Sequence, residues 1–261
     1  MKRMGNDSLS IVVPVLNEAE NLAALIDRLL GACLSMGRPV EIIFVDDGST
    51  DGSTDKLRAA VSRQPGEILA VFLDRNYGQH AALFAGFRQA RGDVIVTIDA
   101  DLQNPPEEIP RLIVKIDEGY DVVGTIRQLR QDRLFRRLAS GAMNRISSAV
   151  SGVLMHDYGC MLRAYRRNVV GAMLSRARKR VFIPVLANYF AAHPCEIPVA
   201  HAPRHSGESR YNLWTLVRLQ LNLLMGRPRR EAAGAGEQAG PRYVIKEVAG
   251  ASRLGLKPRE R

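Results

Sequence analysis

The sequence predicts a wound α/β fold in which a mostly parallel sheet is flanked by helices. Short runs rich in Val and Ile recur along the first half of the chain, and each is too continuously apolar to be a half-exposed strand. Amphipathic helical patterns lie between these runs, so strand and helix alternate repeatedly. With 261 residues, 46% of them hydrophobic, the chain can bury a sizeable core.

The strands and helices follow one another in regular order. We expect buried strands at residues 9–16, 40–45, 68–73, 94–98 and 121–126. Helical periodicity predicts helices at residues 18–34, 54–62, 79–90 and 107–117, the last beginning after a Pro-Pro pair that is typical of helix starts. In wound sheets, ligands bind outside the carboxyl ends of the strands. The residues that follow each strand are therefore the candidates for a functional site.

Composition divides the chain into four parts. Residues 1–7 form an N-terminal extension, 8–210 the α/β domain, 211–225 an amphipathic helix and 226–261 a basic tail. The tail holds nine Lys and Arg against four Asp and Glu, about half of the net charge of +10, and its weak apolar periodicity predicts disorder. The predicted helix is mostly apolar and contains Trp214. It is too short to span a bilayer, and polar residues such as Arg218 interrupt it. It would either pack in the core or lie in a membrane surface.

Missing motifs exclude several classes of protein. Three cysteines without a CxxC pair indicate neither a disulfide framework nor a structural metal, and they fit a reducing compartment. The chain has no GxGxxG, Walker A or GxSxG sequence, which argues against dinucleotide redox, P-loop and α/β-hydrolase chemistry. Among the arginines between residues 127 and 137 the single aromatic residue is Phe135, so aromatic residues are not interleaved with them as stacking on single strands requires, and we expect no nucleic acid partner.

Two carboxylates at the end of the fourth strand form a candidate metal site. Asp99 and Asp101 are two residues apart, which would place both side chains on one face. Carboxylates this close repel each other unless a cation lies between them, and Mg²⁺ or Mn²⁺ commonly binds one or two carboxylates together with substrate phosphates. A solvated loop with a helix cap is the alternative for an isolated Asp-x-Asp sequence.

Asp46 and Asp47 follow the second strand. The segment superficially resembles a calcium-binding loop, but Arg58 occupies the position at which a bidentate Glu is required. A turn whose carboxylates accept hydrogen bonds from a base or ribose explains the same residues, and turn chemistry alone is the competing explanation. Arg127 in one arginine cluster, and Arg204 and Arg210 in a Gly-containing loop, are candidates for gripping phosphates.

The ordered set of motifs resembles a known family. The segments IVVPVLNE at residues 11–18, VDDGSTD at 45–51, RNYGQH at 75–80 and DADLQNPPE at 99–107 are together similar to the family 2 glycosyltransferases with the GT-A fold, within them the group with a polyprenyl phosphate acceptor. GYDVVGT at 119–125 and DYGCMLRAYRR at 157–167 resemble the members that transfer 4-deoxy-4-formamido-L-arabinose in lipid A modification. The similarity covers about residues 8–225.

The resemblance implies a role for each matching residue. It implies a UDP site formed by Pro14, Leu16, Glu18, Asp46, Asp47, Asn76, Gly78 and Asp99. It implies a metal site for Mg²⁺ or Mn²⁺ formed by Asp99 and Asp101 with Gln103 nearby, and catalytic roles for Asp157, a candidate base, and Arg163 of the same motif. Arg127, Arg204 and Arg210 would meet donor or acceptor phosphates; the family commonly has Lys where this chain has Arg210.

We therefore expect an inverting, metal-dependent glycosyltransferase that moves a sugar from a UDP donor to undecaprenyl phosphate. The resemblance implies attachment to the cytoplasmic face of the bacterial inner membrane; family members usually continue into two membrane-spanning helices, and we expect this chain to attach peripherally through residues 211–225 and the basic tail. Two alternatives stay open: a sugar-nucleotide-binding protein without activity and a basic membrane-surface protein. A sugar-nucleotide pyrophosphorylase would need a Gly-rich basic loop where residues 17–20 are acidic. A homo-oligomer is also left open.

Overall fold

A computed structural model describes residues 7–127, 155–176, 182–202, 242–252 and 254. Its strands belong to one sheet of eight strands in the order β7-β5-β6-β4-β1-β2-β3-β8. Their bounds are β1 Leu9–Val15, β2 Val40–Asp46, β3 Ile68–Leu73, β4 Val94–Thr97, β5 Val122–Arg127, β6 Arg163–Arg166, β7 Pro194–Val199 and β8 Ile245–Ala249.

The sheet is mostly parallel, as predicted. The strand β1 pairs in parallel with β2 and β4, β2 with β3, and β5 with β7, whereas β6 and β8 run antiparallel to their neighbours. The chain passes outward through β1, β2 and β3 and then returns to place β4 on the other side of β1. Loops that leave β1 and β4 therefore diverge at this point, and such a switch point opens a binding crevice in wound α/β sheets.

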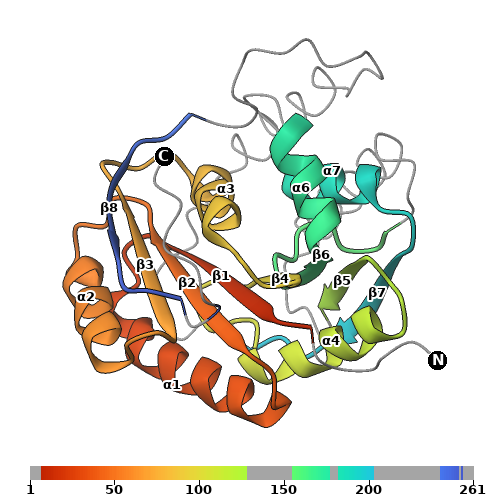
Figure 1. Cartoon of the computed structure of the whole chain (residues 1–261), viewed down its shortest axis with the longest axis horizontal. Coiled ribbons are helices and arrows are strands. Elements are labelled where there is room, and N and C mark those ends of the chain that lie inside the picture. Colours follow the sequence, from red (N-terminus) through yellow and green to blue (C-terminus); the bar gives the residue numbers. More distant parts are fainter. Residues whose placement is uncertain (1–6, 128–154, 177–181, 203–241, 253, 255–261) are drawn as a thin grey trace, which may run out of the picture.

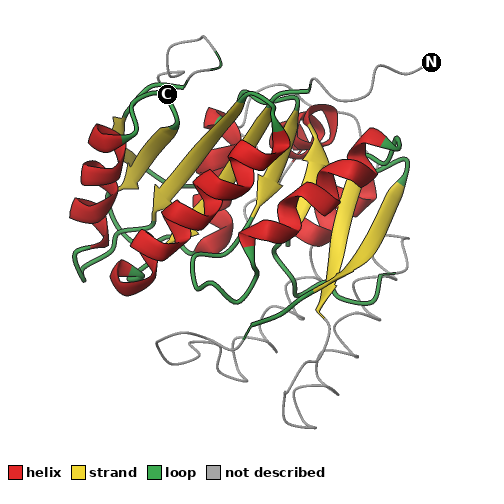
Figure 2. Ribbon diagram, turned by 90° about the horizontal axis from the view of Figure 1, so that it is seen from below, coloured by secondary structure: helices red, strands yellow, loops and turns green. Residues whose placement is uncertain are grey.

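Helices cover both faces of the sheet, and Figure 1 shows α1, α2 and α4 on one side with α3, α6 and α7 on the other. Seen from the α1 side, helices lie in front of the twisted strands in Figure 2. The bounds are α1 Ala19–Met36, α2 Ser53–Arg63, α3 Gln79–Gln89, α4 Ile109–Asp117 after the short 3₁₀ helix η1 Pro106–Glu108, α6 Arg167–Arg176 and α7 Ile183–Phe190. The predicted helices agree with α1 to α4 within a few residues.

Helix α3 packs closely on the sheet because of a glycine. A Cβ atom on Gly86 would lie 2.3 Å from the Cγ1 atom of Val12 in β1. Any larger residue would push α3 away from the strand, since protein interiors are close-packed. The glycine therefore sets the height of α3, and with it the height of Gln79 at the start of this helix, above the carboxyl ends of the strands.

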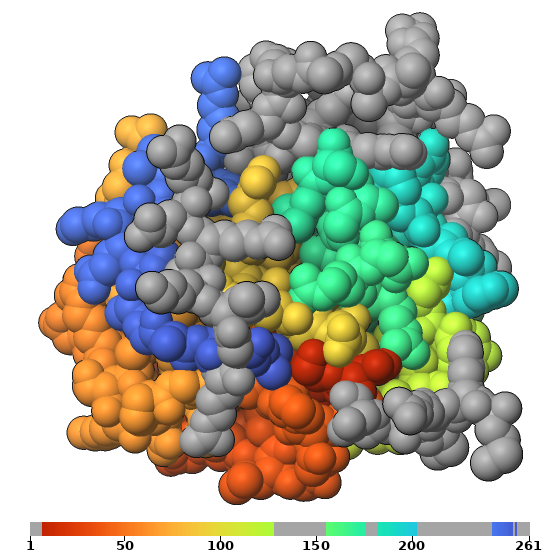
Figure 3. All heavy atoms as spheres, in the orientation of Figure 1, coloured from red at the N-terminus to blue at the C-terminus, as the bar shows by residue number. Residues whose placement is uncertain are grey.

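The prediction of a disordered tail over residues 226–261 is wrong for the segment that forms β8. This strand pairs with the edge strand β3, and Tyr243, Ile245 and Val248 pack against the α3 side of the core. Figure 3 shows the segment against the residues of β3 and α2. Alternating apolar residues are weak evidence for a strand in a basic, Gly-rich stretch, and the unpaired edge of β3 supplies the partner that makes it one.

Strands β6 and β7 are also absent from the sequence prediction. The four residues of β6 include Arg163 and Arg166, and β7 carries Glu196 between two prolines. Neither segment therefore has the continuous apolar pattern that predicts a buried strand. The predicted helix at residues 211–225 lies outside the described residues. In the part of the chain that the structure describes, no helix is both long enough and apolar enough to cross a membrane.

Candidate functional site

Hydrogen bonds tie the loop after β1 to the loop after β2. The backbone N–H of Asn17 donates to the Oγ of Ser49 (2.9 Å), and that of Glu18 donates to the Oγ of Ser53 (3.0 Å). Asn17 adopts a positive φ of 53°, a conformation that Asn tolerates better than most residues. Pro14, Leu16 and Glu18 are all half-buried here, at the switch point. The two loops therefore form one platform rather than two separate turns.

Asp46, at the end of β2, holds its own turn in place. One of its carboxylate oxygens accepts the N–H of Ser49 at 2.8 Å, and the other accepts the hydroxyl of Thr54 at the start of α2. The residue is 2% exposed. These are the hydrogen bonds of a turn, so both carboxylate oxygens of Asp46 have partners within its own loop.

Asp47 joins this turn to the loop after β3. Its two oxygens accept the backbone N–H groups of Tyr77 (2.7 Å) and Gly78 (2.8 Å). Burial raises the pKa of Asp47, and the two backbone hydrogen bonds oppose that rise. Gly48, with a φ of 74°, lies so close to this loop that a Cβ atom would stand 2.6 Å from the carbonyl carbon of Arg75. Asn76, another predicted nucleotide contact, lies exposed in the same loop.

Asp99 and Asp101 lie beyond the end of β4, at the carboxyl edge of the sheet. The Nε2 of Gln79, from the first turn of α3, donates to the Oδ1 of Asp99 at 2.6 Å, and the N–H of Gln103 donates to the Oδ1 of Asp101 at 3.2 Å. Burial and then the charge of Asp101 raise the pKa of Asp99 to about 7, against the opposing effects of Arg127 and Gln79. Two carboxyl groups so close together at the end of β4 favour binding of a cation between them.

This carboxylate pair fits a hard divalent cation. Carboxylate oxygens are the ligands that Mg²⁺ and Mn²⁺ prefer, and these ions commonly use one or two carboxylates with the phosphates of a substrate. No group of three or more His, Cys, Asp and Glu side chains is arranged to hold a metal among the described residues. A cation here would therefore need ligands beyond the pair, such as the oxygens of a diphosphate.

Asp157 and Arg127 form a bidentate ion pair on the other side of Asp99. The Nε of Arg127 lies 2.7 Å from the Oδ2 of Asp157, and its Nη2 lies 2.9 Å from the Oδ1. The N–H of Gly159 also donates to the Oδ1 at 3.0 Å. Asp157 is 5% exposed. The predicted base and the predicted phosphate ligand are thus each other's partner.

Arg163 in β6 is fully buried. Its Nε donates to the carbonyl oxygen of Cys160 (2.9 Å) and its Nη2 to that of Asp157 (2.8 Å). Within the described ranges it forms no ion pair with a carboxylate. The guanidinium thus contacts the backbone of the segment that carries Asp157, and the catalytic role of Arg163 stays a prediction.

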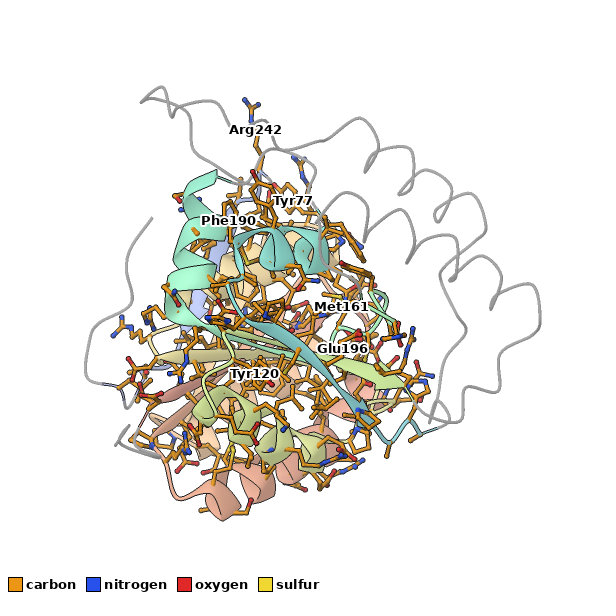
Figure 4. All side chains as sticks on the ribbon, turned by 90° about the vertical axis from the view of Figure 1, so that its right-hand side faces the viewer. Tyr77, Tyr120, Met161, Phe190, Glu196 and Arg242 are labelled. Atoms are coloured by element: carbon orange, nitrogen blue, oxygen red, sulfur yellow. The ribbon has the colours of Figure 1, made fainter. Side chains whose placement is uncertain are left out.

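Two residues of the site escaped the sequence analysis. Glu196 in β7 accepts the N–H groups of His156 (2.7 Å) and Asp157 (3.1 Å), and Gln79 holds Asp99. Figure 4 shows Glu196 and Met161 on the β7 side of the sheet. The position of Gln79 at the start of a helix after a glycine is a usable signal, whereas Glu196 lies in a strand with no apolar run. Arg204 and Arg210 lie outside the described residues.

Comparison with known proteins identifies the family. The model of glycosyl transferase family 2 matches residues 10–174, a range that includes the loops after β1 to β4 and the Asp157 segment. The chain belongs to glycosyl transferase family 2. The predicted GT-A-like fold is confirmed with it, since this family's motifs coincide with the polar carboxyl ends of the sheet.

Relatives within family 2 narrow the resemblance further. The chain is 54% identical over 224 residues to the undecaprenyl-phosphate 4-deoxy-4-formamido-L-arabinose transferase of Pseudomonas aeruginosa (strain LESB58), covering 86% of this chain and 66% of that protein. The protein of the same name from Edwardsiella ictaluri is 54% identical over 216 residues, covering 83% of this chain and 66% of that one. The chain thus spans 66% of the length of these relatives.

Solved structures in the same fold are more distant in sequence. Glucosyl-3-phosphoglycerate synthase from Mycobacterium tuberculosis, in complex with phosphoglyceric acid, superposes with a TM-score of 0.64 at 18% identity, covering 88% of this chain and 83% of that one. The same enzyme with Mn²⁺, UDP and glucosyl-3-phosphoglycerate superposes with a TM-score of 0.61 at 19% identity, covering 97% and 90%. At this level of identity the likeness shows a shared fold alone.

Proposed function

We propose that the protein transfers a sugar, 4-deoxy-4-formamido-L-arabinose, from a UDP donor to undecaprenyl phosphate in lipid A modification. The 54% identity to transferases of that name over 224 residues is the observation that carries the proposal. In the reaction, an oxygen of the acceptor phosphate attacks the anomeric carbon of the sugar. The bond from that carbon to the diphosphate breaks, UDP leaves, and the configuration inverts.

The donor half of this reaction falls to the loops after β1 to β4. Asp99 and Asp101, with Gln103 nearby, would hold Mg²⁺ or Mn²⁺, which when bound neutralises charge on the departing diphosphate. Asp46, Asp47, Gly78 and the residues after β1 form the platform for the nucleotide. Hydrogen bonds among these loops hold the platform together, which would fix the direction of the groups that face the donor.

The acceptor half falls to the pair of Arg127 and Asp157. A phosphate monoester has a second pKa near 6, so most of the acceptor is already a dianion at neutral pH and needs no base to become a nucleophile. The contacts of Asp157 favour a different role, because both of its oxygens hold the guanidinium of Arg127. We assign Asp157 to positioning and Arg127 to the acceptor phosphate, with Arg204 and Arg210 as further phosphate ligands.

We also propose attachment to the cytoplasmic face of the inner membrane, where an undecaprenyl phosphate acceptor would be reached. Basic residues are attracted to anionic lipid by about 1 kcal/mol each near the surface, and high salt screens this attraction. Co-sedimentation with anionic vesicles should therefore fall as salt rises to 1 M. Binding that persists undiminished, or no binding at low salt, would contradict a mainly electrostatic attachment.

The decisive experiment is mass spectrometry of the lipid product formed from undecaprenyl phosphate and a panel of UDP-sugars with Mg²⁺ or Mn²⁺. The proposal expects a single glycosylated phosphate lipid, formed best with the formamido-arabinose donor. UDP binding measured by calorimetry without any product would favour a sugar-nucleotide-binding protein instead. Neither binding nor product would favour the basic membrane-surface protein.

A further inference from the structure

An irregularity in β8 singles out Lys246. In the pairing of β3 with β8, Phe72 lies opposite Glu247, but the next residue, Leu73, lies opposite Ile245. Lys246 is therefore the extra residue of a β-bulge and has no partner in β3. Bulges redirect side chains and are frequent beside active sites. Lys246 is exposed and forms no hydrogen bond or ion pair within the described part of the chain.

The redirected lysine lines a pocket at the carboxyl ends of β2 and β3. The pocket has a volume of about 220 Å³. Its wall combines the end of β2 with the turn after it, the first turns of α2, the end of β3 and one residue of β8, namely Asp46, Gly48, Ser49, Thr50, Thr54, Arg58, Phe72, Leu73, Asp74 and Lys246. The wall thus shares Asp46 and Gly48 with the donor platform. Residues almost 200 positions apart in the sequence meet in it.

Further contacts fix β8 to this wall. The N–H of Asp74 donates to the carbonyl oxygen of Val244 at 3.2 Å, just where the chain enters the loop that Asp47 holds. The Nη2 of Arg58 in α2 lies 2.8 Å from the Oε2 of Glu247, and the guanidinium stacks 5.0 Å from the centre of the Phe72 ring. In Figure 4, Tyr77 and Arg242 lie toward the same end of the molecule.

We propose that Lys246 of the C-terminal strand binds the nucleoside part of the donor, and this rests on the proposed function. The pocket offers hydroxyl and carboxylate groups, and Arg58, its other cation, is paired with Glu247. This lining suits a uracil or ribose, with its carbonyl and hydroxyl groups, better than a diphosphate. The ammonium group would donate to a carbonyl oxygen of the base or a hydroxyl of the ribose. The diphosphate itself belongs at the Asp99 and Asp101 pair.

The test compares UDP and uridine binding to Lys246→Ala, Lys246→Arg and the unaltered chain. Calorimetry with Mn²⁺ measures UDP, and an NMR titration measures uridine. Since the side chain is exposed, Lys246→Ala should fold normally, weaken UDP about tenfold and weaken uridine by the same factor. Lys246→Arg should recover most of the affinity. The control Lys115→Ala removes a lysine that pairs with Glu118 on α4, and should bind both ligands as the unaltered chain does.

Each other outcome has a distinct meaning. Unchanged UDP affinity in Lys246→Ala, with binding by the unaltered chain, overturns the role of Lys246 and leaves the proposed function standing. A loss confined to UDP places the lysine at the phosphates and overturns the nucleoside assignment. Absence of UDP binding by the unaltered chain overturns the proposed function, and the role of Lys246 with it.

Discussion

The two sides of the site are held together by different kinds of contact. On the side of β1, β2 and β3, carboxylates and hydroxyls accept backbone N–H groups, as Asp47 does from Tyr77 and Gly78. On the side of β5 and β7, Glu196 likewise accepts the backbone N–H groups of His156 and Asp157, but the side chain of Arg127 is held by another side chain, that of Asp157. Asp99 lies between them; burial and then the charge of Asp101 raise its pKa, and Arg127 opposes that rise.

The two sides differ in how far their geometry depends on a single side chain. A loop held through its backbone by several neighbours keeps its shape when one of them is lost. A long guanidinium has many rotamers, and its direction depends on the carboxylate that fixes it. The donor platform should therefore be sensitive to changes in the backbone, and the acceptor side to the loss of a single charge.

The largest effect is expected where the two sides meet. Asp99→Asn or Asp101→Asn should abolish Mn²⁺-dependent UDP binding and lower turnover by about 10³-fold, because an amide is a much weaker ligand for a hard cation. Circular dichroism should show an intact fold. The exposed Asp27→Asn on α1 serves as the matched control. Metal-dependent UDP binding that survives in both variants rules out the carboxylate pair as the metal site.

The next effect isolates the acceptor side. Asp157→Asn should bind UDP normally but turn over about 10²-fold more slowly, since the amide cannot hold Arg127 with two oxygens. The pH dependence of kcat separates the two roles. A positioning residue leaves the limb at low pH unchanged in the variant, whereas loss of a general base removes that limb. Normal turnover would exclude both roles.

A backbone change should affect the donor platform. Gly48→Ala places a Cβ atom 2.6 Å from the backbone of Arg75 at a φ of 74°, so the two loops must separate. We expect a loss of stability of about 1–3 kcal/mol and a UDP affinity about tenfold lower. Gly31→Ala is the control, because nothing lies within 4 Å and alanine favours the helix. Equal UDP affinity in the two variants would mean that the loop contact does not shape the site.

The smallest effect concerns the edge of the sheet. Removing residues 242–261 exposes β3 and should cost about 1–2 kcal/mol of stability, or about 3–6 °C in Tm, since the apolar side chains of β8 are only partly buried. UDP affinity should fall as well, because the removed segment carries Lys246. Removing residues 251–261 alone keeps β8 and should have neither effect. A shortened chain without β8 that matches this control would show that the strand is dispensable.

The sequence predicted the first five strands and the helices between them closely, because continuous Val and Ile runs and helical periodicity are local signals. It also placed Asp46, Asp47, Asp99 and Asp101 at one edge, since parallel strands direct their carboxyl ends the same way. It did not predict β6, with its buried Arg163, or β7, the edge strand with Glu196, since strands that carry charged residues are recognisable only from the partners of those residues.

By itself, then, the sequence determined the family, the order of the loops that follow the parallel strands, and the acidic character of the sheet edge at which those loops lie. Only the tertiary structure decided that Asp157 pairs with Arg127, 30 residues away in the sequence. It also decided that Arg163 donates to backbone carbonyls and that Lys246 lines the same pocket as the turn after β2. The physical reason is the same in each case. Pairings between distant segments, and the bulge that redirects a side chain, depend on the edge or charge that the rest of the fold presents, and no local period in the chain encodes that.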